Sequence, residues 1–322
     1  MDNLFIELKS KIENAENIAI ISHVNPDGDT LGSNLALSIV IDKIFKKNVD
    51  SLFAGHLPAM YSFLPEFYRF KNVNDVLDKH YDLVIAVDVA AKDRMLVGSQ
   101  IFDAADYNIV IDHHKTNVGF GKLNIIEADA ACVGVTLYKI FKFWNIEIST
   151  DVARCIYASL LTDTGGFKYE NTTPETFELA ADLVRLGVSP MKEYRACYET
   201  KPQSMVQFQS YVVSNAKFYS CGKIALAKIS KEDMKKFNAS EYFTEGIVET
   251  LRTSKSVEIS AVIRETEEGY AKVSLRSKTL DVTSIVTDFG GGGHAFAAGC
   301  TIKKPLNIAV DKLLERIQSE LF

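Results

Sequence analysis

Short apolar runs alternate with segments of helical periodicity through the first part of the chain. The runs at residues 17–22, 81–90 and 107–114 are largely apolar, which is typical of strands buried on both faces. Apolar residues recur at helical spacing in four further segments: residues 31–47, 130–144, 150–162 and 173–187. This alternation predicts an α/β domain with a doubly wound, mainly parallel sheet over residues 1–187.

The pattern changes after residue 187. Residues 189–219 predict a helix, a break near Pro202 and a longer helix, which we interpret as a helical connector over residues 188–217. Strand and helix patterns then mix: strands at residues 222–230, 256–265 and 269–277, and helices at about 241–253, 281–288 and 307–320. We therefore expect a smaller α/β domain over residues 218–322.

Composition and charge narrow the class of protein. A length of 322 residues favours two domains, and 47% hydrophobic with 24% charged residues is ordinary for a globular protein. The formal charge of −6 disfavours a protein that grips long nucleic acid by its phosphates. The chain has no apolar run of about 18 residues, so no membrane span is expected. The N-terminus lacks the features of a signal peptide, and the five cysteines are scattered without a C-x-x-C motif. We therefore expect a cytoplasmic protein with reduced thiols.

Acidic and histidine residues gather where the predicted strands end. The motif "SHVNPDGD" (22–29) follows the first strand, and "VDVA" and "DHH" end the two later ones. A fourth motif, "LLTDTGGF", follows the helical segment 150–162. Ligands of open α/β sheets bind at the carboxyl ends of the strands. The candidate residues at that edge are His23, Asp27, Asp29, Asp88, Asp112, His113, His114 and Asp163.

Four converging carboxylates, those of Asp27, Asp29, Asp88 and Asp163, would repel one another unless protons or cations compensate them. Carboxylates together with imidazole nitrogens suit Mn²⁺, and also Mg²⁺, Co²⁺ or Fe²⁺. Two such ions roughly 3.5–4 Å apart, bridged by one aspartate, would activate water and clamp a phosphate during in-line attack. The motifs therefore predict hydrolysis of a phosphoester or phosphoanhydride.

Each motif alone has a simpler reading. "NPDG" is also the signature of a solvated turn, and Asp88 alone would serve as a helix cap. The run "GGGGH" (290–294) either surrounds a phosphate with backbone N–H groups or forms a hinge. The nearby "SLRS" favours anion binding, since an arginine can hold phosphate in a bidentate manner. We predict that the phosphate-binding residues are Arg276, Ser277, Gly291, Gly292, Gly293 and His294.

The motifs "SHVNPDGDTLGS", "VDVA", "VIDHHKTN" and "LLTDTGGF" resemble those of the DHH phosphoesterase superfamily, and residues 274–300 resemble its DHHA1 domain. The resemblance implies one metal ion held by three residues: His23, Asp27 and Asp88. It implies a second ion held by four: Asp29, Asp88, His113 and Asp163. It also implies that His114 faces the scissile phosphate and that Asp112 orients a neighbouring histidine.

Within this superfamily the chain is most similar to stand-alone oligoribonucleases of the NrnA type. The resemblance implies a hydrolase with two divalent ions, Mn²⁺ foremost, that degrades short RNA and removes the 3′-phosphate of 3′-phosphoadenosine 5′-phosphate (pAp). A pApA or cyclic di-AMP phosphodiesterase shares the same metal motifs and stays open as an alternative. So does a non-catalytic nucleotide-binding or RNA-binding module. The oligomeric state, with a homodimer as one option, is open too.

Overall fold

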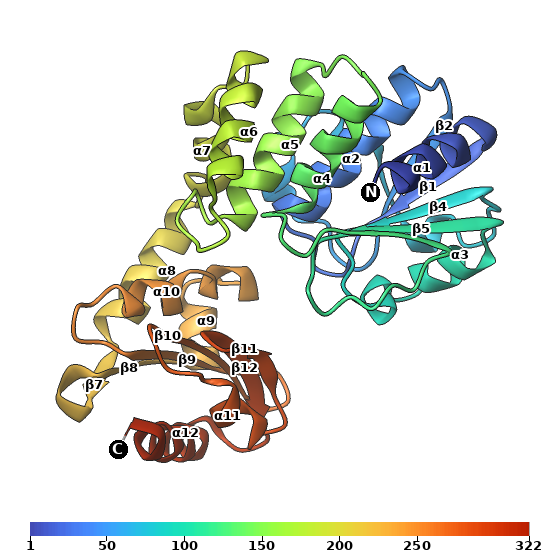
Figure 1. Ribbon diagram of the computed structural model, residues 1–322. Coiled ribbons are helices and arrows are strands. Elements are labelled where there is room, and N and C mark those ends of the chain that lie inside the picture. Colours follow the sequence, from blue (N-terminus) through green and yellow to red (C-terminus); the bar gives the residue numbers. More distant parts are fainter. Residues whose placement is uncertain (322) are drawn as a thin grey trace. The chain divides into compact units, whose positions relative to one another are not determined.

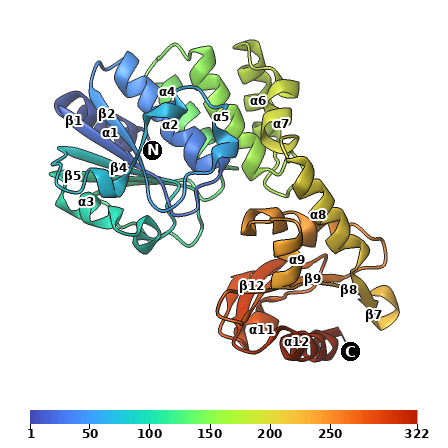
Figure 2. The same ribbon diagram turned by 180° about the vertical axis from the view of Figure 1, so that it is seen from behind.

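The computed structural model of the chain describes residues 1–321, apart from the side chain of His294. It divides into two compact units, Met1–Thr200 and Lys201–Phe322 (Figures 1 and 2), which are described separately below. The division after residue 200 falls inside the predicted connector, so the assignment of residues 188–217 to a separate connector stays a prediction.

The first unit is built on a six-stranded sheet of order β3-β2-β1-β4-β5-β6, and every pairing in it is parallel. Its strands are β1 Asn17–Ile21, β2 Asn48–Phe53, β3 Phe70–Asn72, β4 Leu83–Val87, β5 Tyr107–Asp112 and β6 Leu123–Ile126. The central strands β1, β4 and β5 are buried almost throughout, which explains their uninterrupted apolar sequences. The predicted doubly wound parallel sheet is confirmed.

Helices cover both faces of this sheet. The helices of this unit are α1 Asp2–Asn14, α2 Gly28–Lys43, α3 Gly98–Ala104, α4 Val133–Phe143, α5 Thr150–Asp163, α6 Pro174–Arg185 and α7 Pro190–Tyr198. Of these, α6 and α7 pack against α5 and lie away from the sheet. Figure 1 shows α2, α4 and α5 on one face and α3 on the other. Alternate residues of β1 serve the two cores, since Ile18 and Ile20 pack on the α2 side while Ala19 and Ile21 pack on the α3 side.

Helix α2 is the most deeply buried helix of this unit and touches α5 closely. A methyl group added at Gly32 would lie 2.4 Å from the carbonyl oxygen of Cys155, so only glycine allows this approach. The close contact brings the first turn of α2 and the last turns of α5 together beside the strand ends.

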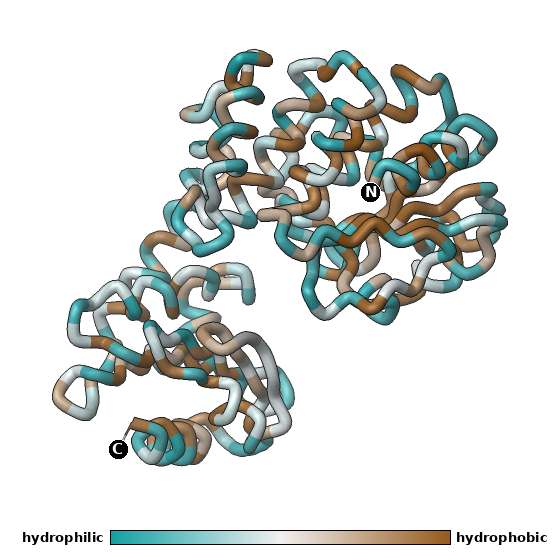
Figure 3. The backbone as a smooth tube through the Cα atoms, in the orientation of Figure 1, coloured by the Kyte–Doolittle hydropathy of each residue, from teal (hydrophilic) through white to brown (hydrophobic). Residues whose placement is uncertain are grey.

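The second unit has a mixed sheet of order β11-β12-β10-β9-β8-β7, in which only β8 and β9 are parallel. Its strands are β7 Lys217–Tyr219, β8 Ile224–Ile229, β9 Ile259–Glu265, β10 Ala271–Ser277, β11 Gly292–His294 and β12 Ala297–Ile302. Its helices are α8 Gln203–Ser214, α9 Lys231–Lys236, α10 Ile247–Arg252, α11 Thr283–Thr287 and α12 Leu306–Leu321. One core lies between the sheet and α11 with α12, the other between the sheet and α8 with α10. Figure 3 shows how apolar positions follow the buried strands of each unit.

Short 3₁₀ turns also lie between these helices and strands. They are Ala59–Tyr61, Phe67–Arg69, Val73–Asp75, Lys92–Met95, Ser220–Gly222 and Glu241–Thr244. The helix expected at 241–253 is interrupted, because Gly246 takes a left-handed conformation with φ 81° between a 3₁₀ turn and α10. Part of the glycine run pairs with β12 as β11, whereas the sequence predicted a loop there. Within residues 1–321, none of the helices combines the length and apolarity that crossing a membrane requires.

Candidate metal centre

The turn after β1 presents the first motif at the start of α2. The Asp27 side chain caps this helix, since its Oδ1 accepts hydrogen bonds from the backbone N–H groups of Asp29 (3.0 Å) and Thr30 (3.1 Å). The simpler reading of "NPDG" as a turn and cap is therefore correct for one oxygen of Asp27. Asp27 also belongs to a group of possible metal ligands with His23 and Asp88.

The other motifs extend from β4, β5 and α5. Asp88 directly follows β4 and has φ 58°, a conformation that costs a non-glycine residue energy and that directs its carboxylate. Its backbone N–H donates to the carbonyl of Ile111 on β5, 3.0 Å away. His113 directly follows β5, and Asp163 is the last residue of α5.

The side chains from these elements meet at one point. His113 Nε2 lies 3.5 Å from Asp29 Oδ2 and 3.6 Å from both Asp88 Oδ1 and Asp163 Oδ2. His23 Nε2 lies 3.5 Å from the other oxygen of Asp88. These separations are long for hydrogen bonds. They suit ligands around a shared cation, because atoms about 2.1 Å from an ion are roughly 3 Å or more apart.

Three groups of ligand atoms close enough to hold an ion share members at this point: His23 with Asp27 and Asp88; Asp29 with His113 and Asp163; and Asp88 with His113 and His114. Burial makes compensation of these charges necessary. Asp29 is 1% exposed and Asp88 is 3% exposed, and Asp88 Oδ1 is buried without a hydrogen-bond partner among the described residues. A buried carboxylate oxygen without a partner is costly, so these residues fit divalent ions.

The pKa values of the clustered residues reflect the same repulsion between carboxylates. Burial, followed by the charges of Asp29 and Asp27, raises the pKa of Asp88 well above its usual range. Burial and the charge of Asp29 raise the pKa of Asp163 to about 7. Burial opposes a charge on His113, but the carboxylates around it outweigh this effect and raise its pKa to about 9. Without a cation, the cluster therefore retains protons near neutral pH.

Hydrogen-bond donors that the sequence did not predict hold the carboxylates of Asp29 and Asp88. Asp29 accepts from the hydroxyls of Ser33 (3.0 Å) and Ser159 (2.6 Å) and from the backbone N–H of Val133 (3.0 Å). The Thr30 hydroxyl donates to Asp88. In the sequence, these donors stand out only as small hydroxyl residues inside otherwise apolar helices. Such residues are common, so they are a weak indication of a functional role.

His114 lies at the edge of the cluster and is held by Asp112. Its Nδ1 is 2.8 Å from Asp112 Oδ1, while the Asn117 amide donates to Asp112 Oδ2 (2.6 Å) and to the carbonyl of Val89 (3.0 Å). Burial works against a charge on Asp112, but the hydrogen bonds from His114 and Asn117 outweigh it and lower the pKa of Asp112. Asp112 thus stays anionic and fixes the orientation of the imidazole. Asn117 was missed as a contributor, although it stands five residues after Asp112 in the quoted motif.

The phosphate-binding residues predicted from the sequence lie in the second unit. Arg276 on β10 donates from Nε to Glu249 Oε1 at 2.9 Å. Ser277 is buried and its hydroxyl donates to the carbonyl of Leu280, so it is already engaged within the chain. The side chain of His294 lies outside the described part of the structure. The roles of these residues stay predictions.

The glycines of this segment differ from one another. A methyl group at Gly291 would lie 2.3 Å from the carbonyl oxygen of Gly299, and one at Gly293 would lie 2.6 Å from that of Ala297. These two glycines allow β11 to pair closely with β12. A methyl at Gly292 would meet nothing within 4 Å, and Gly292 has no left-handed backbone conformation that requires glycine.

Comparison with known proteins covers nearly the whole chain. Residues 17–160 match the DHH family, N-terminal domain, and residues 222–321 match the DHHA1 domain. The bifunctional oligoribonuclease and PAP phosphatase NrnA of Thermus thermophilus is 30% identical over 94% of this chain and 90% of its own length. The protein of the same name from Bacillus subtilis is 26% identical over 92% of each chain. The crystal structure of an exopolyphosphatase-related protein from Bacteroides fragilis superposes with a TM-score of 0.92 at 26% identity, covering 99% of this chain and 96% of that one.

Replacing Asp88 by asparagine should separate folding from metal binding. The raised pKa of Asp88 means that the metal-free fold disfavours its charge, so stability from this group is lost as pH rises. At about pH 8 in EDTA, Asp88→Asn should therefore melt a few degrees above the wild type. It should also lose most of the increase in melting temperature that Mn²⁺ gives the wild type.

Asp112→Asn is the matched control, because Asp112 is equally buried but has a lowered pKa. It should melt below the wild type in EDTA. If Asp88→Asn behaved in EDTA as Asp112→Asn does, repulsion among the carboxylates would not be the dominant force at this site.

Affinity for a divalent ion should increase with pH. An ion must displace the protons that Asp163, with a pKa of about 7, and His113, with a pKa of about 9, retain in the metal-free protein. Between about pH 6 and about pH 8, the affinity for Mn²⁺ should rise by up to about tenfold per pH unit for each proton released. Calorimetric titrations in two buffers of different ionisation enthalpy would count these protons. An affinity independent of pH, with no proton release, would contradict the prediction.

Proposed function

Because the chain belongs to the DHH phosphoesterase family and carries a DHHA1 domain, we propose that it is a metal-dependent hydrolase of short oligoribonucleotides and of pAp. The observation that carries this proposal is the buried, uncompensated cluster of carboxylates and imidazoles at the strand ends. The printed names of the Thermus and Bacillus relatives support the choice of substrates.

Two metal ions fit the cluster. We assign His23, Asp27 and Asp88 to one ion, and Asp29, Asp88, His113 and Asp163 to the other. Asp88 would bridge them, since its two oxygens face different histidines. The carboxylate and imidazole ligands favour Mn²⁺, with Mg²⁺ or Co²⁺ as alternatives. When bound, such a pair activates a water molecule and polarises the phosphoryl group.

His114 and Asp112 would act on the phosphate itself. The Nδ1 of His114 is committed to Asp112, and its Nε2 has no hydrogen-bond partner among the described residues. When the ring is protonated, Nε2–H can donate to a phosphate oxygen, and the anionic Asp112 stabilises the resulting positive charge. Such a donor would stabilise charge that develops on the phosphate oxygens during attack.

The second unit carries the residues that we expect to bind a phosphate. Arg276 is available to a phosphate if it exchanges its pairing with Glu249, and the glycine segment offers backbone N–H groups beside β12. The net charge of −6 fits small nucleotides better than long RNA. The five cysteines are free, which supports a reducing, cytoplasmic compartment.

A substrate panel tests this function. With Mn²⁺, the protein should release mononucleotides from RNA of about two to five nucleotides, and adenosine 5′-monophosphate with inorganic phosphate from pAp, while long RNA is cleaved poorly. Asp88→Asn should be inactive on every substrate. Parallel reactions with Mg²⁺ and Co²⁺ would rank the metals, and chromatography of the products would identify them.

Other outcomes would point elsewhere. Turnover restricted to pApA or cyclic di-AMP would replace the proposal with a signalling-nucleotide phosphodiesterase. Nucleotide binding without turnover under any of these metals would indicate a non-catalytic binding module.

A substitution at Gly292 can test whether the glycine segment binds a ligand without disturbing the fold. Since the chain leaves open space around it, Gly292→Ala should keep the wild-type melting temperature. An added methyl would obstruct a phosphate on the backbone, so KM should rise about tenfold, as expected when hydrogen bonds to a charged group are lost. Gly291→Ala, whose methyl would strike the backbone of β12, should instead lower the melting temperature. A Gly292→Ala variant with unchanged KM would remove this segment from the binding site.

A further inference from the structure

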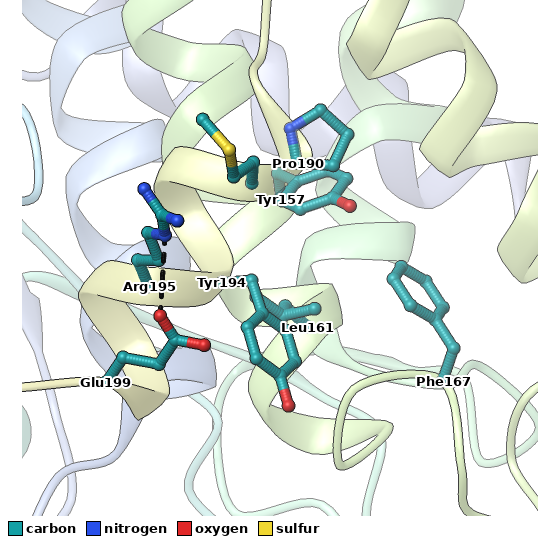
Figure 4. Close-up of a pocket in the computed structure, with 8 residues that line it drawn as sticks. Tyr157, Leu161, Phe167, Pro190, Tyr194, Arg195 and Glu199 are labelled. Atoms are coloured by element: carbon teal, nitrogen blue, oxygen red, sulfur yellow. Dashed lines mark ion pairs between the residues drawn. The ribbon is translucent and has the colours of Figure 1, made fainter.

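A cavity of about 430 Å³ lies in the first unit between α5, the loop after it, and α7 (Figure 4). Three aromatic side chains line it, those of Tyr157, Phe167 and Tyr194, together with Leu161 and Met191. We call this cavity the aromatic pocket. Arg195 and Glu199 also line it and form an ion pair of 3.4 Å, with both side chains largely exposed.

Residues that line the pocket are close in sequence to Asp163 of the carboxylate and histidine cluster. Leu161 stands two residues before Asp163 on α5, and Phe167 stands four residues after it. The same stretch of α5 and its following loop therefore contributes residues to both the ligand cluster and the pocket, within one compact unit.

The backbone that places Phe167 in the pocket is strained. Gly165, Gly166 and Phe167 have φ values of 59°, 74° and 64°, and the last is an unfavourable conformation for a bulky side chain. The fold maintains it, because the Phe167 N–H donates to the Thr164 hydroxyl (3.0 Å) and its ring stacks on Phe177 at 5.6 Å. Strain that the surroundings maintain in this way is characteristic of functional sites.

The opposite wall is also fixed. The Tyr198 hydroxyl on α7 donates to the carbonyl of Leu161 on α5 at 2.9 Å. The buried Glu193 on α7 accepts a hydrogen bond from Arg154 on α5 at 2.7 Å. These two contacts hold α7 against α5, while Tyr194 keeps an exposed ring. The pocket is therefore preformed, which lowers the entropic cost of binding.

We propose that the aromatic pocket binds a nucleobase of the substrate, an inference that rests on the proposed nucleotide hydrolase function. Flat aromatic walls suit the π face of any base, and such stacking tolerates different sequences. The charged pair at the rim can form hydrogen bonds with the base edge or the ribose. A base in this pocket would position the phosphate attached to the same nucleoside beside Asp163.

The chain offers an internal control cavity. A second cavity of about 320 Å³ is lined by Tyr138, Lys142, Ile148 and Asp182, among others. Ile148 stands two residues before Thr150, the first residue of α5, whereas Asp163 ends this helix. This control cavity has a single aromatic wall and lies away from the metal cluster.

A comparison of base-bearing and abasic substrates tests the proposal. The substrates are a 5′-phosphorylated diadenylate and its counterpart with hydrogen in place of both bases. In the wild type, kcat/KM should be higher for the base-bearing substrate. Tyr194→Ala and Phe167→Leu should lower kcat/KM on that substrate by roughly 5- to 100-fold, mainly through KM, and should leave the abasic substrate unchanged. Tyr138→Leu should change neither.

Two measurements keep the result interpretable. Tyr194→Ala should retain the wild-type melting temperature, whereas Phe167→Leu loses the stack on Phe177 and should melt somewhat lower. Both variants should keep the increase in melting temperature with Mn²⁺, which would exclude misfolding as the cause. The second measurement is the equilibrium binding of both dinucleotides to the inactive Asp88→Asn protein, with and without Tyr194→Ala. It measures the contribution of the pocket to affinity independently of turnover. Base-dependent binding that is lost with Tyr194 supports the pocket even if the wild type hydrolyses neither substrate, a result that would contradict only the proposed hydrolase function. Equal effects on both substrates, or no preference for a base, would overturn the inference.

Discussion

Repulsion among carboxylates buried at the edge of a parallel sheet is the interaction on which the rest of the first unit depends. Asp29 and Asp88 are almost inaccessible to water, and Asp163 adds a third negative charge beside the same histidine. Such an arrangement disfavours the metal-free, fully ionised state of the fold. Divalent cations reverse the sign of this interaction, so the feature that destabilises the empty cluster is the one that gives it affinity for metal.

The fold maintains this cluster through rigid elements rather than flexible loops. Asp88, directly after β4, has a left-handed backbone conformation, Asp27 caps α2, and the hydroxyls of Ser33 and Ser159 hold Asp29. The approach of α5 to α2 at Gly32 makes the Ser159 contact possible. These three carboxylates are therefore oriented in the fold itself, which would reduce the reorganisation that metal binding requires.

The sequence predicted the sheet and the convergence of the motifs, because buried parallel strands are continuous apolar runs whose carboxyl ends share one edge. It did not predict β3 and β6, which are short and only partly buried, or β11, where glycines gave no strand signal. The hydrogen-bonding roles of Thr30 and Ser159 were not predicted for a different reason. Thr30 contacts Asp88, 58 residues away, and Ser159 contacts Asp29, 130 residues away, and local sequence patterns carry no record of such contacts.

The metal cluster by itself cannot select a substrate, since it recognises only a phosphoryl group and the oxygens around it. Selectivity must come from groups that contact the rest of the molecule. Phe167 sits in a strained loop directly after a proposed metal ligand, so the same segment that completes the cluster also shapes the aromatic pocket. A base in that pocket and a phosphate at the cluster would be positioned by one continuous stretch of α5 and its following loop. This coupling would favour substrates that carry a nucleobase close to the scissile phosphate over simple polyphosphates, and it requires no extended surface for a long chain.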